Sequence, residues 1–182
     1  MLVFLLAAVV VSAIAAVTDY RTGRIPNWLT LGGMVAGIVG HVARGWILAD
    51  AKTGLYEGAL ALGGLLFCTL APGLLYWKGG MGGGDLKLYA AIGALCQPML
   101  GIEAQMYSLL IAAVVAPARL AYEGKLFRVL ASSLALLVNP LRRAENRRPV
   151  PVEAMTWFRL GPAIFAGTLT TLLIHGYVLF PR

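Results

Sequence analysis

Long apolar stretches alternate with short charged stretches along the 182 residues of the chain. A helix needs about 20 apolar residues to cross the hydrocarbon core of a bilayer. The pattern therefore predicts six membrane-spanning helices, at residues 1–17, 28–48, 55–77, 88–100, 104–120 and 160–179. No internal repeat or domain boundary interrupts it. The predicted fold class is an all-α polytopic membrane protein with a single domain, residues 1–182.

Composition supports this fold class, because 59% of the residues are hydrophobic and only 13% are charged, whereas a soluble domain carries about 25% charged residues. In a soluble protein the net charge of +7 would suggest a nucleic-acid partner. Here the basic residues gather on one side of the predicted spans, which indicates topology instead, and no nucleic-acid partner is expected.

The basic residues set the orientation of the spans. Three of them fall on one side, Arg44, Lys52 and Arg182. The other twelve are Arg21, Arg24, Lys78, Lys87, Arg119, Lys125, Arg128, Arg142, Arg143, Arg147, Arg148 and Arg159. Because loops rich in Lys and Arg stay in the cytoplasm, the chain is predicted to be a multi-pass protein of the bacterial inner membrane with both termini outside. The run 1–16 also resembles a signal peptide, but the absence of a basic residue before it favours a retained helix.

The predicted cytoplasmic segment, about 121–159, contains a further amphipathic stretch. Apolar residues of 126–138 fall on one helical face, which predicts an interfacial helix on the inner leaflet. Four arginines between positions 142 and 148 are expected to bind anionic lipid headgroups.

Cysteine and histidine give no sign of a metal or a cofactor. Cys68 and Cys96 lie in apolar stretches without a CxxC pair, and His41 and His175 each stand alone. Buried small side chains and hydrogen-bonded histidines explain them, so neither a disulfide, a metal site nor a cofactor is predicted.

Two acidic residues stand at predicted helix ends on the cytoplasmic side. Asp19 directly follows the first span, which is expected to continue through it, and Asp85 ends a glycine-rich run, residues 79–84. Each has a structural explanation: Asp19 as an ion-pair partner of Arg21 or Arg24, and Asp85 as the N-cap of the fourth helix. A phosphate-binding loop is excluded, because the Gly-Lys-Ser/Thr ending is missing.

Together the two carboxylates suggest catalysis. Acids at the hydrocarbon boundary are costly and usually functional, and two that face each other favour a state in which one keeps its proton. One could then accept a proton from water while the other polarises a carbonyl group. An ion pathway uses such acids equally well, so an ion- or proton-coupled transporter stays open at this point.

The residues around both aspartates resemble those of the type IV prepilin peptidases, membrane aspartic proteases of the GxGD kind. Residues 19–27, DYRTGRIPN, resemble the family's D-x-x-x-x-x-I-P-N segment, and residues 82–88, GGGDLKL, resemble its G-x-G-D-x-K-L segment. The Gly161-Pro162 pair that opens the last span resembles the ending of short members. The likeness covers nearly the whole chain.

This resemblance implies that Asp19 and Asp85 are catalytic and that Gly82, Gly84 and Lys87 belong to the catalytic loop. It adds Pro26 and Asn27 as positioning residues; by itself, Asn27 is also predicted to cap the second helix. Lys87 could act as a membrane anchor or tune the local charge.

The resemblance also implies a substrate and an activity. An endopeptidase of this kind cleaves the leader from prepilin or pseudopilin precursors, after a glycine, at the cytoplasmic face. Because the chain lacks a CxxC pair and a long insert after the first helix, we expect cleavage without N-methylation, as in the short peptidases of Tad/Flp pilus systems. Archaeal preflagellin peptidases are similar in plan. A transporter and a non-enzymatic assembly subunit remain the alternatives.

Overall fold

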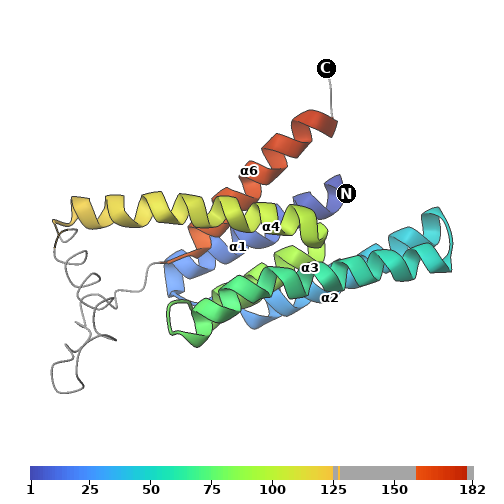
Figure 1. Ribbon diagram of the computed structural model, residues 1–182, viewed down its shortest axis with the longest axis horizontal. Coiled ribbons are helices and arrows are strands. Elements are labelled where there is room, and N and C mark those ends of the chain that lie inside the picture. The colour runs from blue at the N-terminus through green and yellow to red at the C-terminus, as the bar shows by residue number, and fades with distance from the viewer. Residues whose placement is uncertain (125–126, 128–158, 180–182) are drawn as a thin grey trace, which may run out of the picture. The chain divides into compact units, whose positions relative to one another are not determined.

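The structure is a computed structural model that describes residues 1–124, 127 and 159–179 (Figure 1). The predicted interfacial helix and the arginine run both lie largely or wholly outside these residues, so they stay predictions. The chain divides into two units, one of Met1–Ile111 with Arg159–Arg182 and one of Ala112–Phe158. Both aspartates lie in the first unit, which is described below.

The described residues form helices and no strands, which confirms the all-α prediction. These helices are α1 (Leu2–Thr22), α2 (Asn27–Leu48), α3 (Ala51–Trp77), α4 (Gly83–Tyr122) and α6 (Gly161–Leu179). Helices α1 and α6 pack against each other, as do α2 and α3. The predicted bounds are close for most elements, although α3 begins four residues earlier than expected.

Four of these helices, α1 to α4, are long and apolar enough to cross a membrane. The face of α1 that carries Val3, Leu6, Val10 and Ile14 is exposed, while small residues such as Ala8 and Ala15 are buried. An apolar outer face around an interior of small residues fits a multi-pass membrane protein. The count of six spans and the sides on which the termini lie stay predictions.

Helix α4 covers the regions that were predicted as two separate spans. Its backbone leaves helical geometry at Gln97, where φ is 60° and ψ is 176°, directly before Pro98. The chain reverses its direction there (Figure 1). A Cβ added to Gly101 would lie 3.0 Å from the Cα of Gly93, so residues eight positions apart are in contact across the reversal. We call residues 83–96 the first arm of α4, and the residues from 98 onward the second arm.

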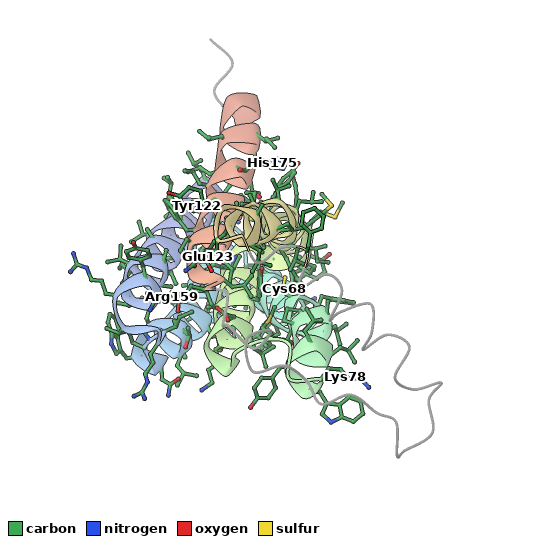
Figure 2. All side chains as sticks on the ribbon, turned by 90° about the vertical axis from the view of Figure 1, so that its left-hand side faces the viewer. Cys68, Lys78, Tyr122, Glu123, Arg159 and His175 are labelled. Atoms are coloured by element: carbon green, nitrogen blue, oxygen red, sulfur yellow. The ribbon has the colours of Figure 1, made fainter. Side chains whose placement is uncertain are left out.

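The first arm lies in the interior of the unit. Nine consecutive residues of it, from Leu88 to Cys96, are buried. Cys68 of α3, labelled in Figure 2, is also completely buried in this interior. Helix α2 approaches the first arm through its glycines: a Cβ on Gly37 would lie 2.7 Å from the carbonyl oxygen of Ala94. Small residues at this contact let the two backbones approach closely, which fixes the helix that carries Asp85.

A tight turn joins α1 to α2. Helix α1 continues through Asp19, as predicted, and ends at Gly23, whose φ of 67° is left-handed. The N–H of Gly23 donates to the Asp19 carbonyl oxygen at 2.8 Å. Pro26 is extended, and α2 begins at the next residue without a side-chain cap. The prediction that Asn27 caps α2 is therefore wrong, because Asn27 is already the first helical residue.

Candidate functional site

Asp19 lies in the last turn of α1, and its side chain faces the interior of the unit. The residue is only 7% exposed. The backbone N–H of Gly161, the first residue of α6, donates to the Asp19 Oδ2 atom at 3.1 Å. The carboxylate thus occupies the amino-terminal end of a helix, where free N–H groups and the helix dipole favour a negative charge. In the described part of the chain no salt bridge joins Asp19 to an arginine, so the ion-pair explanation is not supported there.

Gly161 is a site residue that sequence reasoning did not assign. A Cβ at this position would lie 2.8 Å from Asp19 Oδ2 and 2.9 Å from Asp19 Cβ, well inside van der Waals contact. Only glycine therefore lets α6 approach the carboxylate this closely. The Gly161-Pro162 pair was visible as a point of resemblance, but no local pattern connects it to a residue 142 positions earlier.

Arg159 adds a second contact between the start of α6 and the end of α1. Its guanidinium donates to the Tyr20 carbonyl oxygen and lies 5.9 Å from the centre of the Tyr20 ring. Figure 2 shows the labelled Arg159 beside α1. Because Tyr20 directly follows Asp19, this contact holds the turn of helix that carries the carboxylate.

Asp85 lies in the first turn of α4 and is half-buried. Since α4 begins at Gly83, Gly82 holds the N-cap position and Asp85 is the third helical residue. The Gly82 backbone N–H lies close enough to interact with its carboxyl group, as in the reach-back arrangement of a capping box. The prediction that Asp85 is the N-cap of this helix is therefore wrong, because Asp85 lies three residues after the N-cap position. Its carboxyl group still interacts with the backbone at the start of the helix.

The two aspartates come together although 66 positions separate them. The two carboxyl groups lie within electrostatic range of each other, and the residue before Asp85, Gly84, packs on Ile25, just after the end of the helix that carries Asp19. Both also lie at the amino-terminal end of a helix, α6 for Asp19 and α4 for Asp85. Paired carboxyl groups in such a setting can share one proton and activate a water molecule.

The two sequence motifs also meet away from the carboxylates. Lys87 Nζ donates to Asn27 Oδ1 at 3.0 Å, across 60 positions. A Cβ on Gly84 would lie 3.3 Å from the Ile25 Cβ, so Gly84 allows the segment before Pro26 to pack on the start of α4. The structure thus brings Asn27, Lys87 and Gly84 to the same junction, while Pro26 sets the turn beside it.

Only one glycine of the glycine-rich run 79–84 has a backbone conformation that favours glycine. Of residues 79–84, only Gly79 has a positive φ, 74°, and it ends α3 through a hydrogen bond to the Tyr76 carbonyl oxygen at 2.9 Å. Gly82 accepts from Leu86 N–H at 3.3 Å and so starts α4. Close packing at Gly84, rather than left-handed backbone along the whole run, explains the glycine nearest to Asp85.

A second buried polar cluster lies along α2, about 21 Å from Asn27 at 1.5 Å per residue. His41 is completely buried, with Nε2 2.9 Å from the Leu95 carbonyl oxygen and Nδ1 3.3 Å from Glu57 Oε2. Arg44 donates to the same carboxylate at 3.0 Å. Gln97 Nε2 lies 3.2 Å from His41 Nδ1. The interpretation of His41 as a hydrogen-bonded histidine is confirmed, and the cluster holds the residue at which α4 reverses.

The described residues include no candidate metal centre. Within residues 1–124 and 159–179, no group of three or more His, Cys, Asp or Glu side chains is arranged to hold an ion. His175 instead contacts Glu103, with 2.8 Å between Nε2 and Oε2, and both cysteines are free and buried.

Comparison with known proteins agrees with the paired carboxyl groups of the site. A sequence model described as the type IV leader peptidase family matches residues 5–117, more than half of the chain and a region that contains both aspartates. The chain is also 40% identical over 82 residues to the prepilin leader peptidase/N-methyltransferase of Escherichia coli (strain K12). That match covers 44% of this chain and 35% of the relative, so it spans well under two thirds of the relative's length. No solved structure matches.

Proposed function

Because the chain belongs to the type IV leader peptidase family, we propose that it is an aspartic endopeptidase that removes the leader of prepilin precursors, with Asp19 and Asp85 as its catalytic pair. The observation that carries the proposal is the convergence of these two carboxyl groups, each at the start of a helix, from motifs 66 positions apart.

The proposed mechanism uses both carboxyl groups and no covalent intermediate. The ionised carboxylate takes a proton from a water molecule, whose oxygen attacks the scissile carbonyl carbon. The protonated carboxyl group polarises the carbonyl oxygen, and a proton passes to the leaving amine as the C–N bond breaks. The hydrogen bond from the Gly161 N–H to Asp19 supports this scheme, because it holds that carboxyl group in one orientation.

The proposed location is the cytoplasmic face of the bacterial inner membrane. It is supported by the twelve basic residues on the predicted side of the aspartates against three on the other. A hydrophobic precursor with a basic leader would reach the two carboxyl groups from this face. Because small residues surround the site, a substrate with glycine before the scissile bond would fit there.

We also propose cleavage without N-methylation, in the manner of the short Tad/Flp pilus peptidases. Only four residues, 23–26, separate α1 from α2, and the two cysteines of the chain form no CxxC pair. The relative from Escherichia coli is also an N-methyltransferase, but the match covers only 35% of that protein.

A cleavage assay on membranes tests the proposal. Wild type, Asp19→Asn and Asp85→Asn would be compared at matched expression on a prepilin with glycine before the scissile bond. Loss of either carboxyl group should lower the rate by at least about 100-fold, the lower range for a general acid or base. Asp50→Asn is the matched control, because Asp50 is an exposed N-cap of α3 and asparagine caps nearly as well.

The outcomes separate the alternatives. Wild-type cleavage with two inert, correctly inserted variants agrees with a catalytic pair and rules out a transporter or an assembly subunit as the main function. If either Asn variant cuts at the wild-type rate, the two-carboxylate mechanism is wrong. Mass measurement of the new amino terminus, with S-adenosylmethionine present, should detect no added methyl group.

A further inference from the structure

Tyr89 is a buried polar residue that the proposed mechanism does not yet use. It lies four positions after Asp85 on α4, which is one helical turn, so both side chains emerge from the same side of the helix. Tyr89 is 1% exposed. In the described part of the chain its hydroxyl is the buried side-chain polar atom without a hydrogen-bond partner. A buried hydroxyl of this kind needs an explanation, because such groups are nearly always paired.

The neighbouring Ser108 hydroxyl does not supply the missing bond. It lies close enough to interact with Tyr89, and because it donates its own proton to the Ala104 carbonyl oxygen at 2.6 Å, it could pair with Tyr89 only as an acceptor. No bond of acceptable geometry joins the two hydroxyl groups. The Tyr89 proton therefore remains available to another acceptor.

The reversal at Gln97 indicates the direction in which the Tyr89 side chain runs. Because Gly93 of the first arm contacts Gly101 of the second and the chain reverses between them, Ser108 lies at about the level of Leu86 along the first arm, close to the turn that carries Asp85. A hydroxyl next to Ser108 thus lies on the Asp85 side of Tyr89. This agrees with the tilt of helical side chains toward the amino-terminal end, and the Asp85 charge acts on the Tyr89 hydroxyl.

We propose that Tyr89 is a positioning residue for the cleavage reaction, whose hydroxyl, unpaired in this structure, donates a hydrogen bond to the Asp85 carboxyl group in the reacting state. This inference rests on the proposed function. One Asp85 oxygen would be held by Gly82 and Tyr89, which leaves the other free to face Asp19 and the attacking water. Titratable groups that act on this pair come from three helices: Asp19 from α1, Cys68 from α3 and Asp85 itself from α4.

The experiment measures kcat, KM and the pH–activity profile of Tyr89→Phe, which removes the hydroxyl and keeps the ring. We expect kcat to fall about 10- to 100-fold, the effect of one hydrogen bond to a charged group, with KM nearly unchanged. The acid limb of the profile should move to higher pH, because loss of a donor disfavours the ionised carboxylate of the coupled pair.

Two controls separate positioning from packing. Tyr56→Phe makes the same chemical change at an exposed position of α3 and should change nothing. Ser108→Ala removes the neighbouring hydroxyl and should leave the acid limb in place. If Ser108→Ala reproduces the effect of Tyr89→Phe, the Tyr89 hydroxyl serves the packing of α4 and the inference is wrong.

Further outcomes also decide the question. Wild-type kcat and an unchanged profile for Tyr89→Phe overturn the inference, as does a lower yield of folded protein whose remaining activity keeps the wild-type profile. If the wild-type chain itself cuts no prepilin, the proposed function fails first. Cleavage by wild type with an unaffected Tyr89→Phe variant refutes only the role of Tyr89.

Discussion

Replacement of Gly161 by alanine is the most direct test of the contact between α6 and Asp19. The added Cβ would lie 2.9 Å from Asp19 Cβ and 2.8 Å from Oδ2, whereas carbon atoms in contact prefer about 3.5–4.0 Å. Either α6 or the end of α1 must therefore move by about 0.6–1 Å to relieve this overlap. The same movement lengthens the hydrogen bond from Gly161 N–H to the carboxylate.

This displacement should impair catalysis more than folding. A shift of about 1 Å at a reacting group can cost about 100-fold in rate, while overpacking of one methyl group typically costs about 1–3 kcal/mol of stability. We expect Gly161→Ala to insert and fold, to bind substrate with nearly normal KM, and to lose about 100-fold in kcat.

The assay uses purified protein in detergent with a prepilin substrate, together with a thermal unfolding curve for each variant. Gly176→Ala is the matched control, because Gly176 lies on the same helix with no atom within 4 Å of an added Cβ. It should retain full activity. A folded Gly161→Ala variant with kcat within about twofold of wild type would refute the reasoning, since it would mean that Asp19 need not be held this closely.

Two further predictions concern single contacts. Lys87→Met removes the Lys87–Asn27 hydrogen bond and should lower kcat about two- to tenfold. Asn27→Ala should lower kcat by the same factor, and the double variant should lose no more than either single variant. A loss of kcat in Lys87→Met but not in Asn27→Ala would indicate that Lys87 is a membrane anchor. The Thr53 side chain and the hydrogen bond from the Thr53 N–H lower the pKa of Asp50 below its ordinary value of about 3.9. The stabilisation from this contact is therefore present above the pKa of Asp50 in the unfolded chain and is lost as pH falls through its pKa in the folded protein. Asp50→Ala should therefore lower the melting temperature at pH 7 without loss of activity, and this difference from wild type should close in acid; a constant difference across pH would contradict the capping role.

The lengths of the apolar stretches and the two motifs around Asp19 and Asp85 were enough to predict an all-helical membrane protein and its family. These signals are local: a run of apolar residues reports a helix in lipid, and Asp19 and Asp85 stand out because few acids occur beside such runs. The roles of Asn27 and Gly161 could not be predicted in this way. Each depends on a partner at least 60 positions away, and an asparagine before a helix is an equally good cap in isolation.

The break in α4 was predictable in part. Pro98 disfavours helical geometry at the residue before it, and a boundary near Gln97 could have been placed from this signal alone. The positive φ of Gln97 could not be predicted, because a non-glycine residue rarely adopts one. Here the side chain of Gln97 bonds to His41, and such a contact exists only once α2 and α4 have packed together.

The buried first arm of α4 has a consequence for biogenesis. At 1.5 Å per residue its 14 residues extend about 21 Å, less than the roughly 30 Å thickness of the hydrocarbon core. A segment this short is a poor independent substrate for membrane insertion, and nine of its residues touch protein on all sides. We therefore expect it to enter the bilayer together with the second arm, as a hairpin. This hairpin would pack against α1, α2 and α3 after these helices have been inserted. The helix that bears Asp85 would thus be placed late, which keeps the two carboxyl groups apart until most of the chain has been synthesised.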